Sequence, residues 1–213
     1  MPNLKDLKNR IESVKNTRKI TKAMQMVAAA KLRRAQDAAE ASRPYSERFN
    51  NLLASLAASV GSSENSPILL RGTGKQDVHL LIVMTAERGL CGGFNSNIAK
   101  LARSHAAKLK EDGRQVKVIT VGKKGRDALK RDLGEYFVDH VDLSEFKSIK
   151  YVNAQTIAKA LLVRFDDNEY DVATIFYSKF VNVVSQIPTA QQIIPAVFED
   201  QSSASGKAIY DYE

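Results

Sequence analysis

The chain has little of several features that would define its class at once. It contains a single cysteine, Cys91, so an intrachain disulfide is excluded and a reducing compartment is indicated. It has no run of about 18 apolar residues, so no segment is expected to span a membrane. Asp6 and Glu12 follow Met1 closely, without the apolar core of a secretory signal or the acid-poor character of a transit peptide. We therefore expect a protein that works where it is made.

Two phosphate-binding patterns are also absent. Residues 87–95, ERGLCGGFN, form a glycine-rich turn between a predicted strand and a predicted helix, called here the glycine turn. Its glycines lack the G-x-G-x-x-G spacing, and no acidic residue follows on a second strand to bind a ribose. The G-x-x-x-x-G-K-[ST] pattern does not occur either. A tight structural turn is favoured over a nucleotide site, and no cofactor is expected.

The charge is positive and unevenly distributed. The 213 residues are 44% hydrophobic and 26% charged, which suits one domain with an extension, and the formal net charge is +8. Residues 1–40 hold ten Lys and Arg against four Asp and Glu, which leaves +6 in this stretch. A basic surface indicates an acidic partner, which can be nucleic acid, anionic lipid or protein.

Residues 4–60 read as one long amphipathic helix. Its heptad positions are apolar at both ends, as in a coiled coil, but polar from residue 18 to 25, where Ile20, Met24 and Val27 form a second apolar line. About 57 residues span on the order of 85 Å. A globular part of some 135 residues should be roughly 36 Å across. The helix should therefore need a partner. At Pro44 either the helix kinks or two helices abut, and a kink is favoured because the apolar register continues beyond the proline.

The rest of the chain alternates strands and helices. Residues 61–76 read as a linker, because Pro67, Gly72 and Gly74 interrupt them. The following pattern predicts a mostly parallel α/β domain. Its predicted strands are 78–85, 116–121, 136–141, 172–177 and, broken by Pro188, 180–194; its helices are 95–111, 123–131 and one capped by Asn153, with a further edge at 208–212.

Other candidate sites have simpler explanations. Cys91 as a catalytic nucleophile would need a base, and the sequence places none of the three histidines near it. The acidic residues of 166–171 lack EF-hand spacing, so a solvated turn is favoured over a metal site. The basic face of the long helix lacks interleaved aromatics before Tyr45, so it offers no platform for bases.

Two segments carry a resemblance to a known family. LKDLKNRIESVKNTRKITKAMQMVAAAKLRRAQ, residues 4–36, resembles the N-terminal helix of the gamma subunit of F-type ATP synthase, and TAERGLCGGFNSN, residues 85–97, is similar to that family's second characteristic segment. The resemblance implies a coiled-coil rotor shaft joined to a Rossmann-like α/β domain. It implies no catalytic, cofactor-binding or metal-binding residue in this chain.

The resemblance also implies partners and contact residues. Contacts with the ring of alpha and beta subunits would involve Lys19 and Met24 on the shaft, and Arg88 and Cys91 in the turn that meets the acidic loop of beta. YSKFVNVVSQIP, residues 177–188, is similar to a late sheet segment of the family. Contacts at the end that holds the epsilon subunit and stands on the membrane c-ring would involve Tyr177, Lys179, Tyr210 and Tyr212.

The family pattern further implies a division into a shaft helix (1–60), a linker (61–76) and an α/β domain (77–213). It also implies a second long helix, which this sequence does not contain. The resemblance points to a non-catalytic central stalk that couples proton-driven rotation of the c-ring to ATP synthesis. Its location would be the cytoplasmic face of a bacterial inner membrane, with membrane association only through the complex.

Two alternatives from other classes are kept. The first is a basic nucleic-acid-binding α/β protein with a helical arm, for which steep salt dependence on random duplex is the signature. The second is a small dinucleotide enzyme, which would retain a cofactor on purification and be protected by it against unfolding.

Overall fold

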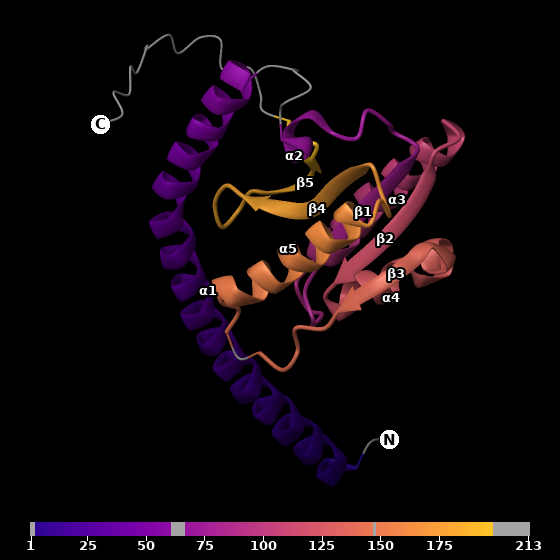
Figure 1. Cartoon of the computed structure of the whole chain (residues 1–213). Coiled ribbons are helices and arrows are strands. Elements are labelled where there is room, and N and C mark those ends of the chain that lie inside the picture. The colour runs from indigo at the N-terminus through magenta and orange to yellow at the C-terminus, as the bar shows by residue number, and fades with distance from the viewer. Residues whose placement is uncertain (1–2, 61–66, 147, 198–213) are drawn as a thin grey trace. The chain divides into compact units, whose positions relative to one another are not determined.

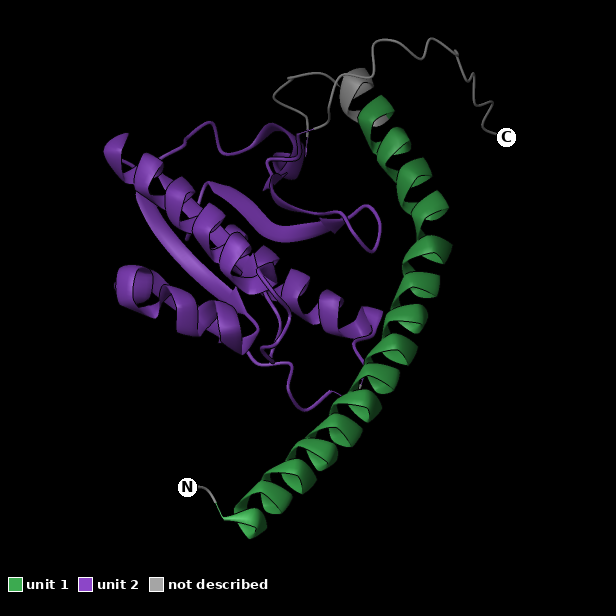
Figure 2. Ribbon diagram, turned by 180° about the vertical axis from the view of Figure 1, so that it is seen from behind, with its two compact units in different colours: residues 1–59 green, residues 60–213 purple. Residues whose placement is uncertain are grey.

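The structure is a computed structural model that describes residues 3–60, 67–146 and 148–197 (Figure 1). The chain divides into two compact units, residues 1–59 and residues 60–213 (Figure 2). The first unit is a single helix, and the second is an α/β sheet with its helices. Each unit has its own internal organisation.

The first element, α1, is the helix Leu4–Val60, which confirms the long helix expected from the heptad pattern. It contains no glycine, and Asp6 lies in its first turn, where a negative charge is favourable. Two threonine hydroxyls near the polar stretch donate to backbone carbonyls of the preceding turn. Thr17 donates to the carbonyl of Ser13 at 2.9 Å, and Thr21 donates to the carbonyl of Thr17 at 2.8 Å. The polar stretch therefore continues the helix.

Pro44 lies inside α1 without ending it. Figure 2 shows one continuous, curved helix, so the alternative of two abutting helices is wrong. Proline removes one backbone hydrogen bond and crowds the preceding turn, which favours bending at that point. The large apolar side chains of α1 are exposed: Leu4, Leu7, Ile11, Val14, Ile20, Met24, Met26, Val27, Leu32, Tyr45, Phe49 and Leu52.

The second unit is built on a five-stranded sheet in the order β3-β2-β1-β4-β5 (Figure 1). Four strands are parallel, and β5 is antiparallel to β4. This confirms the mostly parallel α/β domain. The strands are β1 (Val78–Met84), β2 (Gln115–Val121), β3 (Phe137–Val141), β4 (Val172–Phe180) and β5 (Gln186–Ile194).

Helices cover both faces of the sheet. On one face, α3 (Phe94–Glu111) and α4 (Lys123–Leu133) pack against alternate residues of the strands, including Leu81, Val83 and Phe176. On the other face, α5 (Tyr151–Asp166) packs Leu161 and Phe165 against a second buried cluster. Because side chains alternate along a strand, the continuous apolar run of β1 supplies both clusters.

The end of the sheet differs in detail from the predicted strands. Val172–Phe180 continues as one strand, β4, and the reversal falls before β5, so Pro188 does not break a strand. Pro188 lies within β5, opposite Ser178, and β5 is the edge strand of the sheet. An edge strand has one side free of partners, which is where a residue without an N–H is tolerated.

A short helix, α2 (Ile68–Arg71), lies within the stretch that the sequence assigns to the linker. The N–H of Ala196, just after β5, donates to the carbonyl of Leu69 at 3.0 Å. Gly72 lies so close to Pro195 that a Cβ on the glycine would be 3.1 Å from the proline Cγ. The segment that leads into the sheet and the segment that follows its last strand are therefore fastened together.

Two further predictions concern helix and strand ends. Asn153 lies in the first turn of α5 rather than at its cap, and its side chain accepts the N–H of Lys150 at 2.8 Å. Asn153 thus satisfies a backbone donor at the helix start, but it is the third residue of the helix, and the N-cap itself is Lys150. The predicted edge at residues 208–212 lies outside the described residues.

Candidate functional site

The glycine turn lies at the carboxyl end of β1, where the strand order reverses. From β1 the chain continues to β2 and β3 on one side, and later returns to β4 on the other side of β1. In open α/β sheets this crevice is the usual position of a ligand. The chemistry of the turn therefore decides between a ligand site and a surface for a protein partner.

Asn95, in the first turn of α3, holds the two ends of the glycine turn together. Its Oδ1 accepts the N–H of Ala86 at 2.9 Å, and its Nδ2 lies 3.4 Å from the carbonyl oxygen of Arg88 and 3.1 Å from the Sγ of Cys91. The glycines allow the reversal between these bonds, since Gly92 has φ +58°. One amide thus fixes the backbone on both sides of Arg88.

Glu87 fixes the turn to the rest of the sheet. One carboxylate oxygen accepts the N–H of Lys123, the first residue of α4, at 3.0 Å. The other accepts the N–H of Leu143, which follows β3, at 2.7 Å. The N-terminus of a helix carries partial positive charge and favours an anion. In this chain its own carboxylate occupies that position.

Thr85 makes a second attachment to the same helix. Its Oγ1 accepts the N–H of Gly125 at 2.7 Å and lies 3.3 Å from the carbonyl oxygens of Val121 and Gly122. A Cβ at Gly122, which has φ +90°, would collide with the carbonyl oxygen of Thr85. The two glycines at the start of α4 therefore allow a close backbone approach, and they do not form a phosphate loop.

A polar pocket of about 220 Å³ adjoins the N-terminus of α3. None of its lining residues carries a charge, so it lacks the cation that a phosphate site normally supplies. It is lined by Gly93, Phe94, Asn97, Ser178, Val184, Gln186 and Pro188. The pocket also shows that the glycine turn and the β4–β5 reversal are neighbours at this edge of the sheet.

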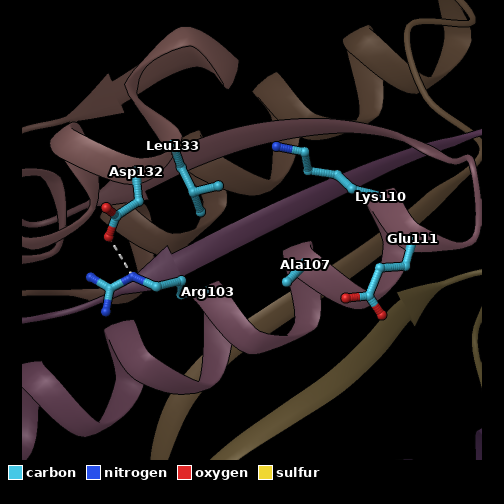
Figure 3. Close-up of a pocket in the computed structure, with 6 residues that line it drawn as sticks. All are labelled: Arg103, Ala107, Lys110, Glu111, Asp132 and Leu133. Atoms are coloured by element: carbon cyan, nitrogen blue, oxygen red, sulfur yellow. Dashed lines mark ion pairs between the residues drawn. The ribbon is translucent and has the colours of Figure 1, made fainter.

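A larger groove of about 440 Å³ lies between α3 and α4 (Figure 3). It is crossed by the ion pair of Arg103 Nε with Asp132 at 2.6 Å. The Nζ of Lys110 lies 4.5 Å from the ring centroid of Tyr136, as in a cation–π contact. Arg103 and Asp132 are thus paired with each other across the groove, which is an open seam between two helices.

The outer part of the glycine turn is exposed. Arg88 and Cys91 are both exposed, and Leu90 is 99% exposed with φ +61°. A large apolar side chain held outward in a left-handed backbone conformation is costly unless a partner covers it. The two ends of the glycine turn are held by hydrogen bonds, while its tip exposes the apolar Leu90 and the cationic Arg88. This combination is typical of a surface that contacts another protein.

The surroundings of Cys91 do not suit a nucleophile. Its thiol meets the amide of Asn95 and lies 4.0 Å from the carbonyl oxygen of Arg88. Neither group is a base that would activate a thiol.

The structure places the remaining candidate residues in three locations. Tyr177 and Lys179 lie on β4, on the face that α5 covers, because Ala173 of the same strand belongs to that cluster. The hydroxyl of Tyr177 donates to Oε1 of Gln191 at 3.0 Å. Lys19 and Met24 lie on α1, with Met24 56% exposed. Tyr210 and Tyr212 lie outside the described residues.

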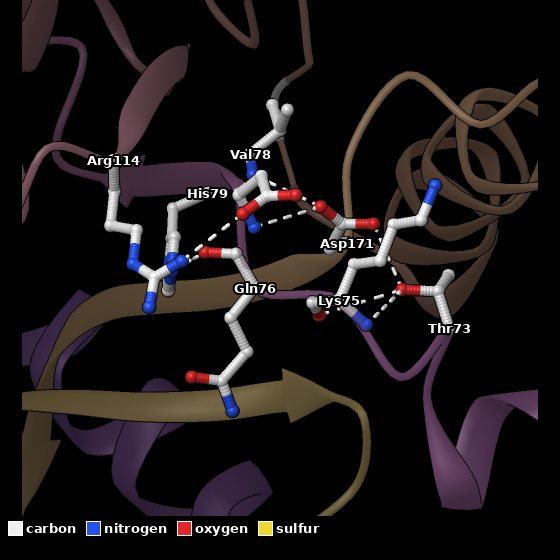
Figure 4. Close-up of polar contacts among 8 residues, drawn as sticks. Thr73, Lys75, Gln76, Val78, His79, Arg114 and Asp171 are labelled. Carbon is white, nitrogen blue, oxygen red and sulfur yellow. Dashed lines mark hydrogen bonds and ion pairs between the residues drawn. The ribbon is translucent and has the colours of Figure 1, made fainter.

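The acidic turn after α5 serves the fold (Figure 4). Asp171 accepts the backbone N–H groups of Asp77 and Val78, each at 3.0 Å, and the hydroxyl of Thr73 at 2.8 Å. Burial alone would raise the pKa of Asp171, but these three donors outweigh it and hold the pKa below its ordinary value. Within residues 3–60, 67–146 and 148–197, no group of three or more His, Cys, Asp or Glu is placed to hold a metal ion.

The bracing residues had no recognisable sequence signal. Glu87 reads as one more polar residue of the turn, and its backbone partners lie 36 and 56 residues further along the chain. Gly122 and Gly125 are the one hint, because two glycines at a strand–helix junction indicate a close approach of some kind. Nothing in their spacing points to Thr85 as the group that approaches.

Among the described part of the chain, no helix is long and apolar enough to cross a membrane. This agrees with the exposed, mixed-polarity character of α1.

Comparison with known proteins identifies the family. The family model for ATP synthase matches residues 3–213. The chain is 72% identical over 213 residues to the ATP synthase gamma chain of Roseobacter denitrificans, covering all of this chain and 73% of that relative. It is 69% identical to the ATP synthase gamma chain of Ruegeria pomeroyi with the same coverage. A solved structure from the central stalk and c-ring of the Tetrahymena thermophila mitochondrial ATP synthase matches with a TM-score of 0.62 and 26% identity, covering 83% of this chain and 72% of that one. The chain therefore belongs to the ATP synthase gamma chain family.

Proposed function

We propose that this chain is the central rotor stalk subunit of an F-type ATP synthase. The observation that carries the proposal is α1, a helix of 57 residues with large apolar side chains exposed along its length. Such side chains need partner helices or a surrounding ring to leave water. The family relationship supplies those partners, namely alpha and beta subunits around the shaft and the epsilon subunit and c-ring at the other end.

The subunit does no bond chemistry. Its work is mechanical, because rotation of an asymmetric shaft forces each catalytic beta subunit through states that differ in nucleotide affinity. One charge crossing 100 mV releases about 2.3 kcal/mol, so the energy of several protons must be pooled for each ATP. The N-terminus of α4 is occupied by the carboxylate of Glu87, and the turn between β1 and α3 lacks the dinucleotide spacing, which supports a transmitting role over a nucleotide-binding one.

The ring-facing contacts are assigned to the shaft and to the glycine turn. Lys19 and Met24 would face the alpha and beta subunits, and Arg88 and Cys91 would meet the acidic loop of beta. The exposure of Arg88, Cys91 and Met24 supports this assignment. A single exposed ion pair contributes only about 0–1 kcal/mol, so Arg88 would align the contact more than it stabilises it.

The second set of contacts is assigned to the epsilon subunit and the c-ring. Tyr177 and Lys179, on the α5-covered face of β4, would belong to this set together with Tyr210 and Tyr212. Lys179 is exposed and Tyr177 is half-buried, so both leave side-chain surface available for a partner, which supports the assignment. The two sets of contact residues would lie on different faces of the sheet. The glycine turn leads into α3, which covers the face opposite to that of Tyr177 and Lys179.

The organisation follows from these roles. Residues 1–60 would be the shaft, 61–76 the connection and 77–213 the α/β domain. α2 and its bond to Ala196 give the connection a structured end. The location would be the cytoplasmic face of the bacterial inner membrane, held there through the complex.

Co-purification tests the assignment directly. A tagged chain expressed with alpha and beta subunits should yield a complex of fixed stoichiometry, and a chain recovered alone would contradict the proposal. In that complex Arg88→Glu should lower ATP-driven proton pumping, because it places like charges at the acidic loop. Arg131→Glu is the matched control, since Arg131 is an exposed arginine at the far end of α4. Equal pumping by the two variants would refute the Arg88 contact.

No observation supports the nucleic-acid alternative. Its test remains simple, because binding to random duplex that falls steeply with salt would favour it.

A further inference from the structure

Glu87 does more than close a turn. Its carboxylate joins three separate segments: the glycine turn, the start of α4 and Leu143, two residues after the end of β3. Each oxygen accepts one backbone N–H, so both donors lose their partner if the carboxylate moves away. Glu87 also immediately precedes Arg88, so its position determines where the exposed tip of the turn begins.

The other supports of the turn act on different atoms. Asn95 fixes the backbone on both sides of Arg88 from the α3 side, and Thr85 attaches the end of β1 to α4. Only Glu87, among these three, reaches beyond α4 to the segment after β3. The tip is therefore anchored to the α3 side by an amide and to the β3 side by a carboxylate.

We infer that Glu87 is a positioning residue for coupling: it sets the orientation of the glycine turn against the acidic partner surface. This inference rests on the proposed function, and the role it gives to Glu87 acts through the backbone that its carboxylate holds. The half-buried carboxylate of Glu87 resists displacement because two backbone donors would be left unsatisfied. A turn held in this way transmits the force exerted by a partner subunit to the sheet, whereas a loosely held turn would deform under that force.

The test compares two variants with similar local chemistry at opposite ends of the sheet. Glu87→Gln keeps the size of the side chain but leaves one of the two N–H groups facing an NH₂. Asp171→Asn also replaces a carboxylate by an amide, at the amino end of β1, where one oxygen accepts two backbone N–H groups and the other accepts the hydroxyl of Thr73 (Figure 4). Urea unfolding of each variant gives its free energy of unfolding, so that the readouts below are compared at known stability.

The first readout is hydrogen exchange in the full chain. In Glu87→Gln we expect the amides of Ala86 and Phe94 to exchange about two- to tenfold faster, the factor that corresponds to one lost hydrogen bond. In Asp171→Asn these two amides should exchange as in the unchanged chain. Equal rates at these amides in both variants would overturn the inference.

The second readout is the number of protons pumped per ATP hydrolysed by the assembled complex. We expect this ratio to fall in Glu87→Gln while the hydrolysis rate is kept, and to stay unchanged in Asp171→Asn. A general loss of stability would lower both variants alike, so it would contradict the role given to Glu87. Failure of the proposed function would look different, because the unchanged chain would then not assemble with alpha and beta subunits.

Discussion

Replacing Gly125 by alanine gives the sharpest test of how the glycine turn is attached. Gly125 is the third residue of α4, and alanine at a helical position is normally more stable than glycine by about 0.5–1 kcal/mol. Here a Cβ would lie 2.7 Å from the Oγ1 and 2.9 Å from the Cγ2 of Thr85. Both distances are shorter than real Cβ contacts, so Thr85 must move.

The expected cost has two parts. Overpacking of this kind costs about 1–3 kcal/mol. Displacing Thr85 also weakens the 2.7 Å bond that it accepts from the Gly125 N–H, which is worth about 0.5–1.5 kcal/mol. After subtracting the helix gain, Gly125→Ala should lower the free energy of unfolding by about 1–3 kcal/mol.

Gly134→Ala is the matched control. Gly134 ends the same helix with ordinary helical angles, φ −59° and ψ −32°, and a Cβ there would meet only the Lys130 Cγ at 3.7 Å. We expect it to stabilise the chain by about 0.4–1 kcal/mol. The chain has no tryptophan, so hydrogen exchange of the central amides of β1 and β2 is the suitable measurement of unfolding.

A double-mutant cycle isolates the contact. Combined with Thr85→Ala, which removes both crowding atoms, Gly125→Ala should cost at least about 1 kcal/mol less than it does alone. If Gly125→Ala stabilises the chain as Gly134→Ala does, the close approach of Thr85 to α4 is wrong. The attachment of the glycine turn would then need another explanation.

Three further predictions concern other parts of the chain. Tyr170 is buried, its hydroxyl donates to the carbonyl of Leu161 at 2.8 Å, and burial raises its pKa to about 12, so Tyr170→Phe should cost about 0.5–1.5 kcal/mol in urea unfolding. Burial lowers the pKa of both His79 and His105, so the unfolded chain binds more protons and the free energy of unfolding should fall as the pH drops below about 6.5. His105→Asn should make that decline shallower, and an unchanged slope would contradict this. Pro44→Ala restores a backbone N–H within α1 and should slow amide exchange around that position, with no change in β1.

The sheet was predictable from the sequence because its signals are local. β1 is an unbroken apolar run, and its burial on both faces follows directly from that run. The helices α3 and α4 begin within a residue of their expected positions, since a strand end and a glycine define each one. Strong periodicity over many residues leaves few alternative structures.

The details that differ depend on distant partners or on very short elements. α2 has four residues between Pro67 and Gly72, which is too short for periodicity to indicate a helix. Pro188 suggests a broken strand until the sheet order shows that β5 is an edge. The roles of Glu87 and Asp171 depend on backbone donors far away in the chain, and no local pattern encodes such bonds.

The hydrogen bond between Leu69 and Ala196 has a consequence for how this protein can change over time. This bond ties the two ends of the α/β unit together, so residues 69–196 begin and end at the same place. Loops within this stretch can gain or lose residues while the two tethered ends keep their spacing. We therefore expect length differences between homologues to occur within residues 69–196, whereas α1 should keep a constant number of helical turns.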